Sequence, residues 1–479
     1  MKKSLGKNFI FDVSYRIVNV IAPLITAPYI SRVIGSEGVG YHSVAQSLTG
    51  YFTAFAALGI VTYGQREIAY CGEDRGKRSQ LFWEIFILRL IITAIVAMIY
   101  CFFIQTKDGI IKSLLLIQAI DFVGGITDIT WLYQGTENFL TLAIRNILMR
   151  LLGIVCILIF VKEETDLYKY AFIVCISTVV SNFSMLVGLK QYVGKPQLRN
   201  LEIFRHLKPT LRLFVPTITL TVYSLIDKTM LWDITSTASA NGYYEQATKI
   251  VTILITLVCA IGNVAAPRTA KLFADGDKKG IESITIKSIL FTLFLSIPIV
   301  FGVTVISADF VLWFFGNEYQ AVGPLLSILS IVCVPMSVKY VIGNQYLVST
   351  KKEKTYIMSL LFGLLVNIIF NAILIPQYQA MGAVVASIIS EFSIAFFQLI
   401  SLRRDIKLKA VSKQLGQFLL SGIIMFLAIG FWKLNVSNIL MEILIKMIIG
   451  AIVYCGCLWI LKNETLIALK NRFFHIRVR

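Results

Sequence analysis

The chain has little charge and few of the residues that enzymes use for catalysis. Of its 479 residues, 15% are charged and three are histidines, which lie far apart at His42, His206 and His475. A histidine-based metal site or catalytic triad is therefore not expected. The eight cysteines form no C-x-x-C pair and lie mostly inside apolar runs. This placement favours small packing residues over a disulfide framework or a zinc site.

Two further functions are disfavoured by what the sequence lacks. The nucleotide-binding pattern G-x-x-x-x-G-K-[ST] does not occur, so hydrolysis of ATP by that route is not expected. The net charge of +18 would suit a nucleic-acid partner only if it formed a basic patch on a soluble domain, whereas the basic residues lie in short segments between apolar runs. We expect no nucleic acid and no cofactor, and coupling to H⁺ or Na⁺ stays open.

Long apolar runs dominate the chain. The hydrophobic share is 57% and the mean hydropathy +0.76, which predicts an all-α polytopic membrane protein. Windows of about twenty apolar residues predict about fourteen transmembrane helices. They fall at 9–33, 39–64, 81–104, 110–134, 139–161, 167–189, 210–234, 242–266, 286–307, 322–346, 356–375, 380–402, 413–432 and 439–461. The basic start Met1–Lys7 is interpreted as leading into a retained first helix rather than a cleaved signal.

Basic residues gather in every second connection between these windows. The connections on the side of the N-terminus carry many lysines and arginines, and the opposite connections offer little beyond Lys107, Lys162, Lys169 and Lys433. By the positive-inside rule, both termini are expected in the cytoplasm. The outer connections are short, so no sizeable outer domain is expected.

A polar pattern repeats in the two halves of the chain. Polar residues and prolines recur at steps of three and four, and so on one helical face, in two places: Asp12, Arg16, Asn19, Pro23 and Thr26, and again Arg212, Pro216, Thr219, Tyr223 and Asp227. The next helix opens alike in both halves, at Gly40–Ala45 and Gly242–Ala247. Six helices separate the two openings, so we expect parallel repeats with a site between them. The predicted divisions are an N-lobe (1–200, helices one to six), a C-lobe (201–405, helices seven to twelve) and helices thirteen and fourteen with a basic cytoplasmic tail (406–479).

Several charged residues fall deep inside the predicted spans. The cations are Arg16, Arg89, Arg150, Lys228, Lys249 and Lys339. Other polar candidates for a cavity or for ion coupling are Asp12, Asn19, Asp121, Asp128, Arg145, Asp227, Glu245, Asn367 and Glu391. Because an ionised group at the centre of a bilayer is costly, two interpretations compete. Acids and cations pair inside each lobe, or several cations face a water-filled cavity and attract a phosphate or pyrophosphate. The excess of deep cations favours an anionic substrate.

Five short stretches resemble bacterial polysaccharide flippases of the Wzx type, which share a superfamily with multidrug and toxic compound extruders and lipid II flippases. The stretches are Pro23–Gly40, Asp128–Gly135, Tyr223–Leu231, Gly242–Ala247 and Pro267–Arg268. The resemblance implies two six-helix lobes with two added helices in the bacterial cytoplasmic membrane. It also implies a transporter, not an enzyme, that flips undecaprenyl-diphosphate-linked oligosaccharide repeat units to the outer leaflet by alternating access through a cationic cavity.

Other functions are weighed against this one. A cation-coupled multidrug exporter of the same fold should have a cavity dominated by acids, and a polysaccharide polymerase or ligase should carry catalytic groups on a sizeable outer loop. If the chain were a passive scaffold, its many buried charges would have no role. Parallel lobes in one chain make a monomer sufficient for transport, and polysaccharide polymerase and assembly proteins are expected partners.

Overall fold

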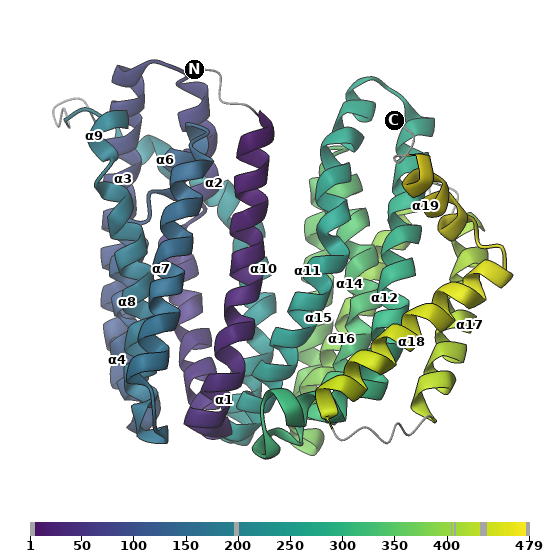
Figure 1. Cartoon of the computed structure of the whole chain (residues 1–479). Coiled ribbons are helices and arrows are strands. Elements are labelled where there is room, and N and C mark those ends of the chain that lie inside the picture. Colours follow the sequence, from purple (N-terminus) through teal and green to yellow (C-terminus); the bar gives the residue numbers. More distant parts are fainter. Residues whose placement is uncertain (1–4, 196–200, 404, 407–408, 432–437, 476–479) are drawn as a thin grey trace. The chain divides into compact units, whose positions relative to one another are not determined.

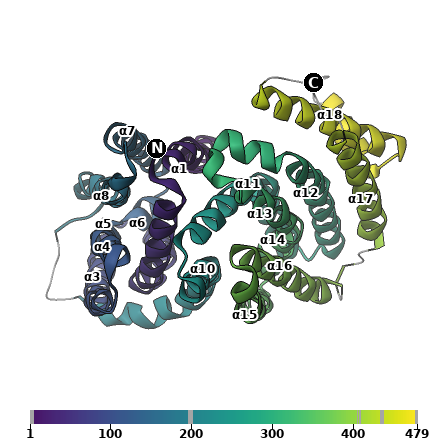
Figure 2. The same cartoon turned by 90° about the horizontal axis from the view of Figure 1, so that it is seen from below.

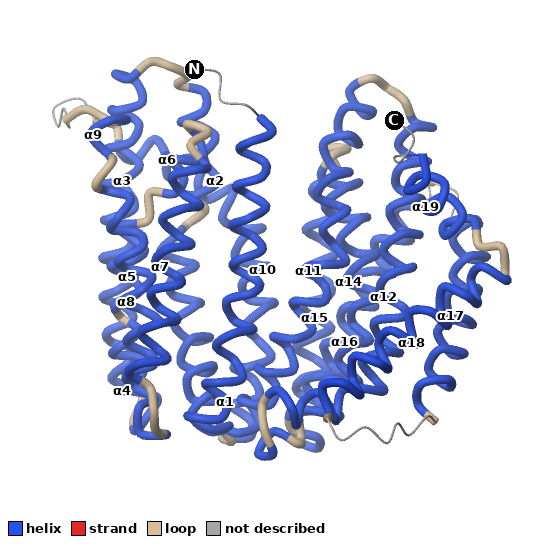
Figure 3. The backbone as a smooth tube through the Cα atoms, in the orientation of Figure 1, coloured by secondary structure: helices blue, strands red, loops and turns tan. Residues whose placement is uncertain are grey.

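The computed structural model describes residues 5–195, 201–403, 405–406, 409–431 and 438–475. Within these ranges, the structure describes the backbone alone of residues 5–23, 260, 261, 263, 264, 410 and 472–475. All regular structure in the described part is helical, as Figure 3 shows. Twelve of its helices are long and apolar enough to cross a membrane. The expectation of an all-α polytopic membrane protein is confirmed.

The chain divides into two compact units. Unit 1 comprises Met1–Trp232 and Ser236–Gly242, and unit 2 comprises Asp233–Thr235 and Tyr243–Arg479. Helix α10 (Leu207–Thr235) thus packs mainly with the helices that precede it. The compact units are defined by packing, whereas the predicted lobes are defined by a repeated sequence pattern. The units therefore do not test the lobe boundaries, which stay a prediction.

The described part of unit 1 contains twelve helical elements up to the end of α10, coloured purple to teal in Figure 1. They are α1 (Leu5–Ala57), α2 (Ile60–Tyr70), α3 (Arg75–Gln105), α4 (Gly109–Gln118), α5 (Ile120–Thr127), α6 (Thr130–Gly135), α7 (Phe139–Phe160), η1 (Glu164–Asp166), α8 (Leu167–Leu186), α9 (Leu189–Tyr192) and η3 (Ile203–His206), followed by α10. Helices α7 and α8 lie side by side in both Figure 1 and Figure 2.

Unit 2 runs from α11 to α19, the green to yellow part of Figure 1. Its elements are α11 (Ala238–Ala274, whose first turn belongs to unit 1), α12 (Lys278–Phe314), η4 (Asn317–Tyr319), α13 (Val322–Leu329), η5 (Ser330–Val332), α14 (Cys333–Tyr340), η6 (Val341–Val348), α15 (Glu353–Tyr378), α16 (Ala380–Leu402), α17 (Lys409–Gly430), α18 (Ile439–Ile460) and α19 (Glu464–His475). The element η6 is a π-helix.

The first two predicted spans form one continuous element with a break. Helix α1 has non-helical torsion angles at Gly35, φ 74° and ψ 176°. A residue with a side chain would be strained there, because positive φ favours glycine. The sequence predicts a connection at 35–38, and the break lies at its first residue. The count of about fourteen helices stays a prediction, because α1 covers two predicted spans and the 37-residue α11 is not among the twelve.

The fourth predicted span is discontinuous. The single run expected at 110–134 consists of α4, α5 and α6, separated at Ala119 and at Asp128–Ile129. Asp128 has extended torsion angles, φ −72° and ψ 100°. Backbone that leaves the helix inside a membrane needs protein partners for its polar groups, because hydrocarbon offers none. Such breaks are typical of transporter binding sites.

Polar side chains join the helices of unit 1 inside its core. Thr49 of α1 lies 2.8 Å from the hydroxyl of Tyr100 in α3 and donates to Oε1 of Gln118 in α4 at 2.7 Å. The same Tyr100 hydroxyl donates to the carbonyl of Leu115 at 2.9 Å. All three polar side chains are at most 2% exposed. These hydrogen bonds satisfy polar groups that neither lipid nor water can reach.

Small residues bring the helices of unit 2 into close contact. A Cβ added at Gly363 of α15 would lie 2.1 Å from Cγ1 of Ile394 in α16. Ser390 donates to the carbonyl of Gly363 at 2.7 Å, and Gln398 donates to Ser359 at 2.9 Å. Close backbone approach with short polar contacts is typical of helix packing in membranes. Large apolar side chains such as Leu365, which is 60% exposed, face outward instead.

The two similar helix openings touch one another within unit 1. A Cβ at Gly40 would lie 1.8 Å from the carbonyl oxygen of Ala238, and a Cβ at Gly242 would lie 2.1 Å from the carbonyl oxygen of Ser36. The contact is therefore reciprocal, backbone against backbone, and it requires glycine on both sides. The predicted repeat begins each of its second helices at these two glycines.

Replacing Gly40 by alanine is expected to destabilise the protein by about 1–3 kcal/mol, because the added methyl group overlaps a backbone carbonyl that has no free space to move into. The measurement is the apparent thermal unfolding midpoint of the purified protein in detergent. Gly125→Ala is the matched control, since nothing lies within 4 Å of a Cβ at that helical glycine. Its helix should gain up to about 1 kcal/mol from alanine. Equal midpoints for both variants would contradict the close contact.

Candidate functional site

Three of the predicted site residues lie in the first arm of α1. Asp12, Arg16 and Asn19 belong to that helix by their backbone. Their side chains lie outside the described residues. Their predicted shared face in a cavity stays a prediction.

Arg89 and Asp128 meet at the break between α5 and α6. Arg89 is 4% exposed, and its Nη1 donates to the backbone carbonyl of Asp128 at 2.9 Å. Its Nη2 lies 3.4 Å from Oδ2 of the same residue, and the other carboxylate oxygen accepts from the backbone N–H of Thr130 at 3.0 Å. Arg89 thus neutralises Asp128 and also satisfies a carbonyl that the broken helix leaves unused. Among the described residues, its Nε has no hydrogen-bond partner.

The other predicted residues of unit 1 lie on α5, α7 and α10. Arg145 of α7 donates to the carbonyl of Ser184 in α8 at 2.6 Å. Asp121 of α5 lies near Cys175 of α8. Arg150 is exposed on α7, whereas Asp227 of α10 is buried and Lys228 beside it is partly buried.

In unit 2, both predicted lysines have acidic partners. Lys339 of α14 lies 2.7 Å from Oε2 of Glu391 in α16, with side-chain exposures of 14% and 3%. Lys249 lies 3.3 Å from Glu245 one turn earlier on α11. The amides of Asn371 and Asn367 hydrogen-bond to each other at 3.0 Å on α15 and are buried.

For Arg89, Lys249 and Lys339, the structure therefore agrees with the interpretation in which acids and cations pair inside each lobe. Each lies against an acid of its own unit, as expected for ionised groups removed from water. The presence of each pair can therefore be explained by charge neutralisation, without a substrate. The assignment of the six deep cations to substrate binding stays a prediction.

A buried cluster around Glu84 was not predicted from the sequence. Glu84 of α3 is 0% exposed, and four donors reach its carboxylate. They are Nε2 of Gln80 at 3.0 Å, the backbone N–H of Glu202 at 3.0 Å, Nη2 of Arg205 at 2.6 Å and Nε2 of His206 at 2.7 Å. Because all four partners donate, the carboxylate is held in its ionised form.

The cluster continues through His206 to α2. Nδ1 of His206 lies 2.7 Å from the hydroxyl of Tyr63, and both residues are at most 5% exposed. Since Nε2 faces a carboxylate oxygen it carries a hydrogen, so in the neutral ring Nδ1 accepts from Tyr63. The cluster ties the segment before α10 to α2 and α3. A glutamate this close to the predicted helix end is easily mistaken for a solvated residue, and its partners come from distant parts of the sequence.

A second unpredicted cluster lies between the loops of unit 2. Nζ of Lys352 is 2.5 Å from Oδ2 of Asp405, which also accepts from the hydroxyl of Tyr346 at 2.8 Å. The hydrogen bond from Lys352 holds the pKa of Asp405 below its ordinary value. Burial lowers the pKa of Lys352, but hydrogen bonds to Asp405 and Tyr346 outweigh it and leave that pKa raised. The contact joins the end of η6 to the connection after α16.

A third cluster is centred on Lys446 of α18, which is largely buried. Its Nζ lies 2.7 Å from Glu442 on the same helix and 3.4 Å from Asp309 of α12. Helices thirteen and fourteen are predicted from the sequence as an added pair, and none of the predicted site residues lies on them. The ion pairs show that α18 is fixed to α12 by more than apolar contact.

The chain is similar to known families over most of its length. The family model described as polysaccharide biosynthesis protein matches residues 5–273, and the model described as MatE matches residues 213–373. An Escherichia coli (strain K12) protein provisionally named an O-antigen transporter is 23% identical over 84% of this chain and 98% of its own length. The capsular polysaccharide biosynthesis protein CapF of Staphylococcus aureus is 22% identical over 81% and 96%.

Solved structures share the fold. The lipid II flippase MurJ in an inward closed conformation aligns with a TM-score of 0.77 at 17% identity, covering 95% of this chain and 99% of that chain. A multidrug resistance transporter of the MATE family in an inward-facing conformation aligns at 0.63 and 14% identity, covering 81% and 94%.

Removing the Glu84 carboxylate is expected to destabilise the protein strongly. Glu84→Ala leaves the buried His206 and the guanidinium of Arg205 without their acceptor, a loss of about 3–5 kcal/mol. The thermal unfolding midpoint in detergent is the measurement. Glu202→Ala is the control, because that side chain is 71% exposed and only its backbone contacts Glu84. If Glu84→Ala melts like Glu202→Ala, the cluster does not hold the fold.

Acid is expected to weaken the loop contact at Asp405. Because its folded-state pKa is lowered, its contribution to stability is fully present above the unfolded-state value of about 3.9 and is lost as pH falls through the folded-state value. Asp405→Asn should therefore lower the unfolding midpoint at neutral pH by the equivalent of less than about 1 kcal/mol, and the difference should vanish in acid. The exposed Asp275→Asn is the control. A difference that is independent of pH would argue against the ion pair.

Proposed function

Because the chain belongs to the polysaccharide biosynthesis protein family, we propose that it is a flippase for undecaprenyl-diphosphate-linked oligosaccharide repeat units. The observation that carries the proposal is the family match over residues 5–273, more than half of the chain. The fold shared with a lipid II flippase supports it. Relatives named for O-antigen transport and capsular polysaccharide biosynthesis point to the same substrate class.

The chain moves its substrate across the membrane and carries out no covalent chemistry in this proposal. It resides in the bacterial cytoplasmic membrane with both termini in the cytoplasm, as the distribution of lysine and arginine favours. In this proposal the N-lobe and the C-lobe move so that the substrate site opens to one side of the membrane and then to the other. One chain holds both lobes, so a monomer is sufficient for transport. Polysaccharide polymerase and assembly proteins receive the product.

Cations bind the pyrophosphate in this proposal. The candidates are the six deep cations of the predicted spans: Arg16, Arg89, Arg150, Lys228, Lys249 and Lys339. Of these, Arg89, Lys249 and Lys339 lie against acids. A paired cation can still share its hydrogens with a phosphate, because an ammonium has three donors and a guanidinium five. Coupling to H⁺ or Na⁺ would use Asp121, Asp128 or Asp227.

A second candidate function is export of amphipathic drugs, favoured by the MatE model match over residues 213–373. The paired acids Glu245 and Glu391 fit that function less well than free acids would, because each is already neutralised by a lysine. One experiment separates the candidates.

Depleting the protein in its host and extracting polyprenyl-linked sugars tests the function. We expect complete, unpolymerised repeat units to accumulate and to stay shielded from an impermeant probe added outside. Accumulation on the outer side would instead indicate a polymerase or ligase. No accumulation would favour the drug exporter.

Removing single cations is expected to reduce transport without loss of folded protein. Arg150→Ala and Lys249→Ala should each slow the flipping of repeat units by roughly ten- to a hundredfold, because a hydrogen bond to a charged group contributes about 1.5–3 kcal/mol. Shielding of the accumulated units from the impermeant probe is the readout. The exposed Lys279→Ala is the control. For Lys249, the double variant with Glu245→Gln avoids an unpaired carboxylate, and unchanged transport in all of these would limit both residues to structural roles.

A further inference from the structure

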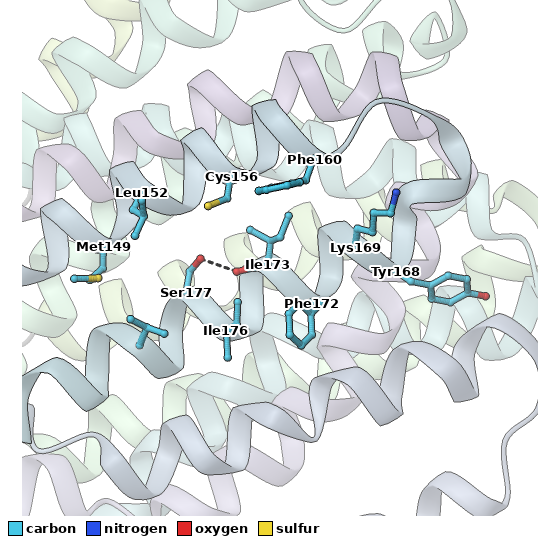
Figure 4. Close-up of a pocket in the computed structure, with 11 residues that line it drawn as sticks. Met149, Leu152, Cys156, Phe160, Tyr168, Lys169, Phe172, Ile173, Ile176 and Ser177 are labelled. Atoms are coloured by element: carbon cyan, nitrogen blue, oxygen red, sulfur yellow. Dashed lines mark hydrogen bonds between the residues drawn. The ribbon is translucent and has the colours of Figure 1, made fainter.

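An apolar groove runs along helices α7 and α8 of unit 1. It encloses about 570 Å³, and Figure 4 shows its lining. Met149, Leu152, Cys156 and Phe160 line it from α7 at steps of three and four residues, so they form one stripe of that helix. The stripe spans eleven residue steps, or roughly 16 Å at the rise of an α-helix. The opposite wall comes from α8, where Phe172 and Ile176 face the groove.

Among the described residues of the groove floor, the hydroxyl of Ser177 is already hydrogen-bonded. A Cβ at Gly153 would lie 2.8 Å from Oγ of Ser177, so the two helices touch closely there. The hydroxyl of Ser177 donates to the carbonyl of Ile173 at 2.6 Å within its own helix, the dashed line in Figure 4. A ligand of this groove therefore needs no hydrogen-bonding groups along its length. Hydrocarbon fits it.

The groove lies on membrane-spanning helices and opens between outward-facing apolar side chains. Both helices belong to segments long and apolar enough to cross a membrane. Leu152 is 54% exposed, Phe160 57% and Phe172 47%, so the walls stand out from the body of unit 1. In a bilayer, such a surface contacts lipid chains, and a groove binds a chain with more contacts than a flat face.

One end of the groove is polar. Nζ of Lys169 lies 2.6 Å from Oδ1 of Asp166, and the lysine side chain is 65% exposed. The other oxygen of Asp166 accepts the backbone N–H groups of Lys162 and Glu163, at 2.8 and 3.2 Å. Asp166 therefore keeps partners when Lys169 turns toward a phosphate. Tyr168 beside it is amphipathic, as is typical of the membrane–water boundary.

We propose that this groove binds the polyprenyl chain of the substrate lipid, with Lys169 next to its phosphate. The proposal rests on the proposed function for the identity of the lipid. The small side chains of Cys156 and Ser177 beside the rings of Phe160 and Phe172 leave an uneven wall. A methyl-branched chain fills such a wall better than a straight acyl chain does. On the predicted topology the Lys169 end belongs to the outer half of the membrane, where the flipped lipid arrives.

Photo-crosslinking from two neighbouring positions tests the proposal. A benzophenone amino acid replaces Leu152, which lines the groove, or Leu151, which is 48% exposed on the same helix but does not line it. The full-length protein is placed in phosphatidylcholine nanodiscs with undecaprenyl phosphate or with phosphatidylglycerol. We expect undecaprenyl phosphate adducts about tenfold more at 152 than at 151, equivalent to about 1.4 kcal/mol. Equal yields at both positions, or phosphatidylglycerol adducts alone, overturn it.

Filling the groove provides an independent measurement. Leu152→Trp should weaken binding of undecaprenyl phosphate by about tenfold in native mass spectrometry, while Leu151→Trp leaves it unchanged. Lys169→Ala should weaken binding of the phosphate but not of undecaprenol, which has no charge. Unchanged binding in Leu152→Trp overturns the proposal. These readouts measure binding and not flipping. Failure of the groove tests would therefore not contradict the flippase proposal, and failure of the depletion test would not contradict lipid binding in the groove.

Discussion

An ionised side chain among membrane helices must have a partner of opposite charge or water, and this constraint organises the interior of the protein. Arg89 satisfies both a carboxylate and a carbonyl of Asp128. Lys339 and Glu391 join α14 to α16, and Lys446 joins α18 to α12. Each pair is a fixed point between two helices, because separating the charges would leave them in a medium of low dielectric constant. Apolar contacts position the helices around these points.

The break at Asp128 shows how the same constraint acts on backbone. A helix that stops inside a span exposes a carbonyl without an intrahelical donor. Arg89 supplies the donor from α3, so a charged side chain repairs a discontinuity of the main chain. The buried arginine and the interrupted helix therefore explain one another. Neither would be stable in hydrocarbon by itself.

Much of the fold follows from patterns local to each segment, and the site does not. Apolar windows predict the spans, and Gly35 with Gly38 predicts the break in α1. The sequence cannot show that Lys339 meets Glu391 and not another acid, because their separation along the chain does not determine how their two helices are rotated about their axes. Glu84 was missed for a similar reason: its partners Arg205 and His206 belong to a segment that looks like a simple basic connection. The depth of a residue in the membrane can be estimated from the sequence, whereas the direction in which its side chain points depends on how the helices pack.

The π-helix η6 between α14 and α15 has an evolutionary consequence. An i→i+5 turn holds one residue more than an α-turn, so such a segment is where a helix accommodates an inserted residue without shifting its neighbours. Tyr346, which reaches Asp405, lies in this segment, and Gly343 in it packs against Tyr356 of α15. Relatives whose chains differ by one residue here can keep α14 and α15 in the same orientation. A one-residue difference in length is therefore expected to disturb the fold less at this position than in an ordinary span, and alignments of such chains should place their gaps there.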